Sequence, residues 1–194
     1  MSRFRSPKEI LQSMRKINEI FYSLQGEGYY TGTPAVFIRF SGCNLKCSFC
    51  DTQHENGVMM TDEAILAEVC KYPAKMVVLT GGEPGLWIDE AFVELLHSVD
   101  KYVSIETNGT RHLPVNLDWV TCSPKKGGAL KVTHIDELKV VYEGQDISMY
   151  EGISALHYFL QPCSGKNTAE VVSYILEHPR WRLSLQTHKL IDIP

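Results

Sequence analysis

The chain has 194 residues, of which 44% are hydrophobic and 22% are charged, and its formal net charge is −4 at pH 7. This length suits one core without a dividing linker, so we expect a single domain over residues 1–194. The negative charge argues against a surface that coats nucleic acid, and no apolar run is long enough to span a membrane. A polar N-terminus without a secretory apolar stretch predicts a cytoplasmic, reducing location.

Apolar runs and helical patterns alternate along the chain. A polar segment with a short helical stretch, 1–16, precedes a predicted strand at 17–24 and a glycine-rich turn at 25–28. Six further strands are expected at 35–40, 75–80, 102–106, 117–122, 135–142 and 155–160. A last strand is expected at 182–186, before an apolar tail.

Three helices are predicted between these strands. Thr61 is placed to cap the first helix, and Asp89 to cap the second. Asn167 and Glu170 form a capping pair for the third helix, which ends at Pro179.

Strands that alternate with helices predict a parallel sheet joined by right-handed crossovers. Two crossovers, 106–117 and 122–135, are very short, and a closed eight-stranded barrel needs more residues than this chain has. We therefore expect an α/β fold, an open partial (β/α)6 barrel with short N- and C-terminal extensions. Polar or glycine-rich residues follow the carboxyl end of each strand, where such sheets bind ligands.

Three cysteines, Cys43, Cys47 and Cys50, follow the strand at 35–40 with the spacing Cys-x3-Cys-x2-Cys. Thiolates within one short loop are typical of a metal site. Three ligands match three corners of a four-iron, four-sulfur cluster and leave one iron open to an outside ligand. The alternatives are three unlinked buried thiols, or structural zinc with His54 as fourth ligand, although zinc ligands usually come from two separated pairs.

This spacing is also the signature of the radical S-adenosylmethionine (SAM) enzymes, which the chain resembles. In that superfamily SAM chelates the open iron, and one electron from the cluster cleaves it to a 5′-deoxyadenosyl radical. The turn Gly81-Gly82-Glu83-Pro84 looks like the superfamily's second hallmark, where backbone holds the amino group of the methionyl moiety. A Cβ on these glycines would block that close approach.

Nearly the whole chain resembles the 7-carboxy-7-deazaguanine synthase family. The motifs that carry this resemblance are Leu24-Gln25-Gly26-Glu27-Gly28, the strand with Arg39, Cys50-Asp51-Thr52, Glu106-Thr107-Asn108-Gly109, Ser123-Pro124-Lys125, Gln161-Pro162 and Ile193-Pro194. The resemblance implies ring contraction of 6-carboxy-5,6,7,8-tetrahydropterin to 7-carboxy-7-deazaguanine with loss of ammonia, in queuosine and 7-deazapurine biosynthesis. It also implies a homodimer that uses Mg2+ and a reducing donor such as flavodoxin or ferredoxin.

The resemblance assigns site residues by position. The cluster ligands would be Cys43, Cys47 and Cys50, and the Thr52 hydroxyl would bind Mg2+. Contacts to SAM would come from Phe49, Cys50, Asp51, Gly82, Ser123, Pro124, Lys125, Gln161, Pro162, Cys163 and Ser164. Contacts to substrate would come from Leu24, Gln25, Gly26, Arg39, Thr80 and Pro194. No side chain stands out as a general acid or base, so we expect no catalytic group beyond the cofactor radical.

Arg39 lies inside an apolar run, where a charge needs a partner. It either forms a structural pair or faces a cavity, and its guanidinium matches the two oxygens of a substrate carboxylate. The apolar tail favours docking, with the Pro194 carboxylate accepting hydrogen bonds from the amino edge of the pterin. Glu27, His188 and Lys189 are candidates for proton transfer during ammonia loss.

Two other functions fit parts of the pattern. A glycyl-radical enzyme activase has similar length and the same cysteine spacing, but it acts on protein and needs no terminal carboxylate in its site. A non-catalytic zinc-binding interaction module would leave the glycine-rich strand ends unexplained. Some members of the synthase family have a longer first cysteine spacing, which bears on the surface where the electron donor docks.

Overall fold

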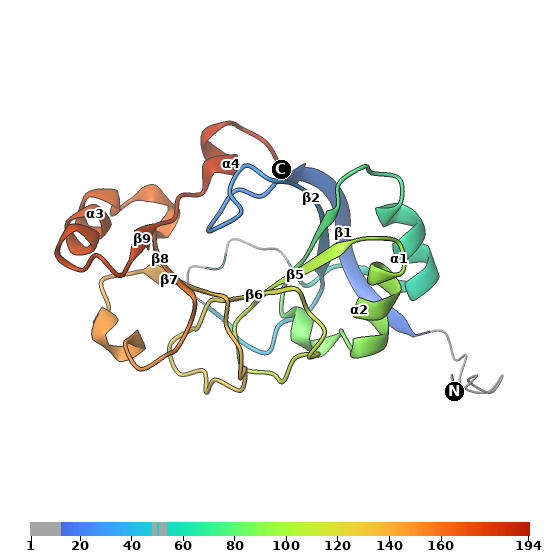
Figure 1. Cartoon of the computed structure of the whole chain (residues 1–194), viewed down its shortest axis with the longest axis horizontal. Coiled ribbons are helices and arrows are strands. Elements are labelled where there is room, and N and C mark those ends of the chain that lie inside the picture. Colours follow the sequence, from blue (N-terminus) through green and yellow to red (C-terminus); the bar gives the residue numbers. More distant parts are fainter. Residues whose placement is uncertain (1–12, 48–49, 51–53) are drawn as a thin grey trace.

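A computed structural model describes residues 13–47, 50 and 54–194. One nine-stranded sheet runs through it, in the order β3-β1-β2-β4-β5-β6-β7-β8-β9. Figure 1 shows the sheet curving from β1 and β2 through β5 and β6 to β8. The strands are β1 (Met14–Leu24), β2 (Pro34–Phe40), β3 (Val58–Thr61), β4 (Met76–Gly81), β5 (Tyr102–Thr107), β6 (Trp119–Cys122), β7 (Glu137–Tyr142), β8 (His157–Pro162) and β9 (Arg182–Leu183).

The core of the sheet is parallel. β2, β4, β5, β6, β7 and β8 pair in parallel in that order, which confirms the predicted open barrel of six strands. β9 continues the parallel pairing beside β8. At the other edge β1 pairs antiparallel with β2, and β3 with β1, so the sheet as a whole is mixed. The short connection between β1 and β2 allows only a hairpin, because a parallel crossover needs a dozen or more residues.

The helices of the described chain are α1 (Asp62–Val69), α2 (Glu90–His97), α3 (Thr168–Glu177) and α4 (Thr187–Leu190), with short 3-10 turns η1 (Pro84–Leu86), η2 (Ile147–Tyr150) and η3 (Cys163–Gly165). The first two helices begin as predicted. Thr61 Oγ1 accepts from the Ala64 N–H at 3.2 Å, and Asp89 Oδ1 accepts from the Phe92 N–H at 2.9 Å. The crossovers from β5 to β6 and from β6 to β7, which the sequence showed to be very short, contain no helix.

The predicted capping pair at α3 is wrong. Asn167 makes no side-chain cap, and Glu170 is exposed. Instead Asn167 Oδ1 accepts from the Cys163 N–H at 2.9 Å, while its Nδ2 donates to the Tyr142 carbonyl at 2.8 Å. The side chain therefore joins the ends of β7 and β8, a contact between segments that a local capping pattern cannot reveal.

Two other boundaries differ from the predictions. The helical stretch expected at 1–16 lies mostly outside the described residues, and from Met14 onward the chain is strand because Met14 pairs with Thr61 of β3. The strand expected at 182–186 ends at Leu183, after which the chain turns into α4.

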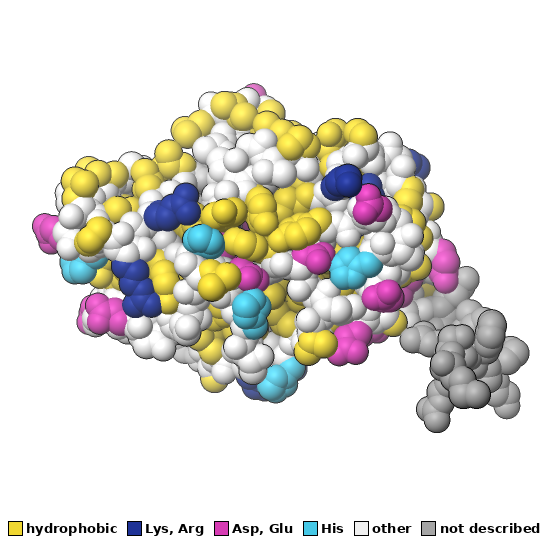
Figure 2. Space-filling model, in the orientation of Figure 1, with side chains coloured by type: hydrophobic (Ala, Val, Ile, Leu, Met, Phe, Trp, Pro, Cys, Tyr) yellow, Lys and Arg dark blue, Asp and Glu magenta, His cyan; other side chains and the backbone are white. Residues whose placement is uncertain are grey.

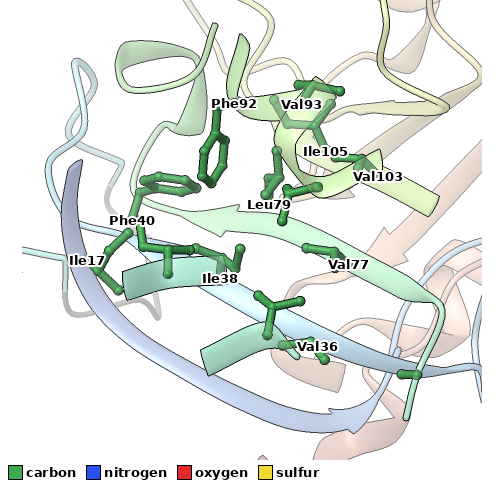
Figure 3. Packing of buried hydrophobic residues seen from close by; sticks show 14 of the residues in the cluster. Ile17, Val36, Ile38, Phe40, Val77, Leu79, Phe92, Val93, Val103 and Ile105 are labelled. Carbon is green, nitrogen blue, oxygen red and sulfur yellow. The ribbon is translucent and has the colours of Figure 1, made fainter. Parts of the chain in front are cut away.

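The main hydrophobic core lies on the outer face of the sheet. Ile38, Leu79 and Ile105 of three neighbouring strands are fully buried and pack with Phe92 of α2 (Figure 3). A second cluster joins β7 and β8 with α3. Because strand side chains alternate between faces, the residues between these core positions point to the inner face, where polar side chains gather.

Candidate active site

A cavity of about 400 Å3 lies at the carboxyl ends of the parallel strands. The predicted site residues that line it are Leu24, Gln25, Gly26, Arg39, Cys43, Cys47, Cys50, Thr80, Gly82, Ser123, Lys125, Gln161, Pro162, Cys163, Ser164 and Pro194. Pro124 is buried and is not part of the lining. Phe49, Asp51 and Thr52 lie outside the described residues. The fold thus brings almost every described candidate to one place.

The cysteine loop starts against the glycine turn at the end of β4. The Gly82 N–H donates to the Phe40 carbonyl at 3.0 Å, and the Glu83 N–H donates to the Gly42 carbonyl at 2.9 Å. A Cβ on Gly82 would lie 2.0 Å from the Gly42 oxygen, so only glycine lets these two backbones approach so closely. The contact between these two backbone segments therefore requires glycine at position 82. The sequence had explained this glycine by the close approach of the cofactor.

The three cysteines fit a cluster that takes three thiolate ligands. Cys43, Cys47 and Cys50 all line the cavity. Burial raises the pKa of the Cys47 thiol, and the positive charge of Lys125 acts in the opposite direction, toward the thiolate that binds iron. Within the described residues, no three His, Cys, Asp or Glu side chains are placed to hold a single metal ion.

A buried charge network lines the cavity beside these thiols. Lys139 Nζ of β7 lies 2.5 Å from Glu27 Oε2 and 3.6 Å from Glu106 Oε1. Glu106 also accepts from Gln25 Nε2 at 3.1 Å and from Thr80 Oγ1 at 2.9 Å. Burial alone would lower the pKa of Lys139, but the carboxylates of Glu106 and Glu27 outweigh it and raise the pKa above its usual value. The network therefore holds a fixed cation between two acidic side chains.

The same pair keeps Glu27 ionised. Burial would raise the pKa of Glu27, yet the charge of Lys139 and its hydrogen bond bring the pKa below the usual value. Sequence reasoning named Glu27 as a proton-transfer candidate and missed Lys139. A signal was present, because Lys139 alternates with the buried Leu138 and Val140 in an apolar strand, as Arg39 does in its own strand.

Arg39 both forms an ion pair and faces the cavity, the two alternatives that the sequence left open. Its Nε donates to Glu19 Oε1 at 2.7 Å, and its guanidinium carbon lies 5.3 Å from the centre of the Phe21 ring. The side chain also lines the cavity. A guanidinium carries five N–H donors, so an ion pair through Nε orients the group without using its whole hydrogen-bonding capacity.

The C-terminal tail folds back onto the β1–β2 hairpin. The Thr187 N–H and Oγ1 both donate to the Gly26 carbonyl at 2.9 Å. Ser23 Oγ donates to the Pro194 carbonyl oxygen, also at 2.9 Å. These contacts place Pro194 at the cavity, next to the start of the hairpin.

The docking of this tail is polar rather than apolar. Leu190 and Ile191, whose apolar character suggested a buried tail, are 72% and 58% exposed. Gln186 Nε2 instead donates to Glu27 Oε1 at 2.9 Å, which links the tail to the charge network. His188 and Lys189 also line the cavity.

The loops after β6 and β8 also line the cavity. Lys125 Nζ donates to Ser123 Oγ at 2.7 Å, and burial, followed by the nearby charge of Lys139, lowers the pKa of Lys125. Gln161 Oε1 accepts from Ser184 Oγ at 2.7 Å. Ser164 has a φ of 49°, a left-handed conformation that is uncommon for a residue with a Cβ and often occurs at ligand sites.

Comparisons with known proteins agree with this geometry. The profile of the radical SAM superfamily matches residues 37–122. The 7-carboxy-7-deazaguanine synthase of Bacteroides thetaiotaomicron is 73% identical over 180 residues, covering 93% of this chain and 99% of that protein. The synthase of Nitratidesulfovibrio vulgaris is 43% identical, covering 92% and 99%. The crystal structure of QueE from Escherichia coli matches with a TM-score of 0.78 at 30% identity, covering 95% of this chain and 100% of that one.

The open parallel barrel and its cavity with three cysteines therefore define a radical SAM enzyme, a class that works with a four-iron, four-sulfur cluster and SAM. The similarity to relatives over 99% of their length identifies the family within this class. The chain belongs to the 7-carboxy-7-deazaguanine synthase family.

Proposed function

We propose that this chain converts 6-carboxy-5,6,7,8-tetrahydropterin to 7-carboxy-7-deazaguanine with loss of ammonia, as a carbon–nitrogen lyase of queuosine and 7-deazapurine biosynthesis. The observation that carries the proposal is the 73% identity to a relative named 7-carboxy-7-deazaguanine synthase, over 99% of its length. The cavity is consistent with it, because cysteines, a strand-borne arginine and the docked tail all line one space.

Cys43, Cys47 and Cys50 would hold the cluster in this proposal. When bound, the cluster and SAM supply the 5′-deoxyadenosyl radical that starts the reaction. The loops after β4, β6 and β8 would hold SAM, through the residues already named for it. The chain contributes orientation and exclusion of water, which is the main task of a protein around a reactive radical.

The substrate would lie between Arg39 and the tail. The Arg39 guanidinium suits the pterin carboxylate, since its fork matches two oxygens. Gln25, Gly26 and Thr80 would supply further polar contacts, and the Pro194 carboxylate would accept from the amino edge. The buried ion pair of Glu27 and Lys139 would lie beside the pterin ring that loses ammonia, with its charges held in place.

Thr52, which lies outside the described residues, would bind Mg2+ through its hydroxyl. We propose a homodimer that receives electrons from a flavodoxin or ferredoxin and works in the cytoplasm.

No helix among the described residues is long and apolar enough to cross a membrane. On the face shown in Figure 2, acidic and basic side chains are scattered rather than gathered into one basic patch.

The proposal is tested by anaerobic reconstitution with iron and sulfide, followed by reductant, SAM and 6-carboxy-5,6,7,8-tetrahydropterin. Mass spectrometry should detect a product lighter than the substrate by one ammonia. SAM cleavage without any change in the pterin would keep the superfamily and overturn the reaction.

Removal of Pro194 separates the proposal from a glycyl-radical enzyme activase. A pterin enzyme that uses this residue should lose most of its product formation, because the terminal carboxylate would move back by one residue, about 3.8 Å, away from the amino edge. SAM binding, measured by calorimetry, should stay within about twofold, a difference under 0.5 kcal/mol. Full product formation by the shortened chain would remove Pro194 from the site.

A further inference from the structure

A closed ring of hydrogen bonds joins the cysteine loop to the end of β5. Asn44 Nδ2 donates to Thr110 Oγ1 at 2.8 Å, and Thr110 Oγ1 donates to Asn108 Oδ1 at 2.6 Å. Asn108 Nδ2 completes the ring by donating to Asn44 Oδ1 at 3.1 Å. Asn44 directly follows Cys43, so the ring ties the first cysteine to the Asn108 motif.

The Asn108 amide group also points an N–H at the cysteine itself. Its Nδ2 lies 3.9 Å from Cys43 Sγ, within reach of a hydrogen bond to sulfur. The orientation of the amide is fixed, because Oδ1 also accepts from the Thr110 N–H at 3.0 Å, and a backbone N–H only donates. The donor must therefore face the sulfur.

Glu83 of the glycine turn holds the backbone of this motif in place. Its Oε2 accepts from the Asn108 N–H at 2.8 Å, and its Oε1 accepts from Thr107 Oγ1 at 2.7 Å. Glu83 is fully buried, and Asn108 is only 7% exposed. The acidic residue of the glycine turn thus acts on the cysteine loop through Asn108, and does not line the cavity.

We propose that Asn108 is a positioning residue that stabilises the reduced form of the cluster by donating a hydrogen bond to the Cys43 thiolate. The inference rests on the radical SAM function only in requiring that Cys43 bind the cluster. Reduction adds one electron, which increases the negative charge on the sulfur ligands, so a donor there favours the reduced state over the oxidised state. Hydrogen bonds to sulfur are among the features that set the potentials of such clusters.

The test is a redox titration of the reconstituted protein without SAM, followed by electron paramagnetic resonance, with Asn108→Leu as the variant. Leucine keeps the volume and removes the donor. We expect the balance between reduced and oxidised cluster to shift about tenfold toward the oxidised form, which is about 59 mV for a one-electron couple. Iron content is measured alongside.

Asn116→Leu is the matched control. Asn116 lies in the same crossover, and its Nδ2 donates to the Glu90 carbonyl at the start of α2, away from the cysteines. The same substitution there should leave the potential unchanged. An equal shift in both variants would show a general effect of the crossover and would overturn the role of Asn108.

Thr110→Val decides the matter if Asn108→Leu takes up no iron. It removes the hydroxyl that closes the ring with Asn44 and Asn108 but keeps the Thr110 N–H and the Asn108 donor. The donor should therefore be held less firmly, and the potential should become more negative by a smaller amount. An unchanged potential in the variants that bind iron would overturn the inference, whatever the product assay shows. If the unsubstituted protein forms no product while Asn108→Leu still shifts the potential, the proposed reaction alone is overturned.

Discussion

Charged side chains in apolar strands mark the functional face of this protein. Arg39 and Lys139 both lie in strands whose neighbouring side chains are buried, and both line the cavity. A buried charge is costly without a partner, and each cation has one, Glu19 for Arg39 and Glu27 for Lys139. The sequence shows that such a residue needs a partner, but the partner comes from a distant segment that only the fold identifies.

The substitution Lys139→Met should destabilise the protein by about 3–5 kcal/mol at neutral pH, because it leaves buried carboxylates without their cation. Glu27, whose folded pKa is lowered, stabilises the fold above its ordinary pKa and loses this contribution as the pH falls through the folded value. In the variant the carboxyl groups can protonate at acidic pH, so the loss should shrink between pH 7.5 and pH 5. Chemical denaturation at the two pH values measures this.

Lys75→Met is the control for that measurement. Lys75 Nζ pairs with Asp100 Oδ2 at 3.2 Å, and both side chains are largely exposed, so removing it should cost at most about 1 kcal/mol at either pH. Equal losses in the free energy of unfolding for the two variants would show that the buried network stabilises the fold no more than an exposed ion pair does.

At the scale of elements, the β1–β2 hairpin and the C-terminal tail form one unit around Gly26. A Cβ at this position would lie 2.2 Å from His188 Nδ1 and 2.8 Å from His188 Cβ. The tail therefore packs against the hairpin at a distance that only glycine permits. The sequence predicted the glycine turn and the docked tail separately, and their contact appears only in the folded chain.

The substitution Gly26→Ala should displace His188 and loosen the tail at the end of the cavity where we propose that the pterin binds. We expect KM for the pterin to rise about tenfold, a loss of about 1.4 kcal/mol, while SAM affinity stays the same. Steady-state kinetics and calorimetry with SAM measure the two effects. Gly152→Ala is the control, since no atom lies within 4 Å of the added carbon. If Gly26→Ala has the same KM as Gly152→Ala, the close contact between Gly26 and His188 is not needed for pterin binding.

Element types were well predicted and long-range pairing was not. The six parallel strands and the helices capped by Thr61 and Asp89 follow from local patterns of apolar and capping residues. The strand β3 and the antiparallel edge depend on pairing with β1, which no local pattern encodes. Asn167 resembles a cap in sequence, yet its side chain joins two strand ends instead.

At the scale of the whole molecule, the site is assembled from segments far apart in the chain. The hairpin, the cysteine loop, the strand ends and the tail reach one cavity because parallel strands present their carboxyl ends on the same side. The cysteine spacing and the glycine turn predicted a cluster site, and Cys43, Cys47, Cys50 and Gly82 do line one cavity. Lys139 and the ring around Asn108 were not predictable, because their roles depend on partners from other strands.

The most direct test of this account is an anaerobic crystal structure of the reconstituted protein with SAM and 6-carboxy-5,6,7,8-tetrahydropterin. We expect a cluster held by Cys43, Cys47 and Cys50, and the pterin carboxylate within hydrogen-bonding distance of Arg39. Pro194 should lie against the opposite edge of the pterin. A pterin bound outside this cavity, or a cluster held by other residues, would contradict the account.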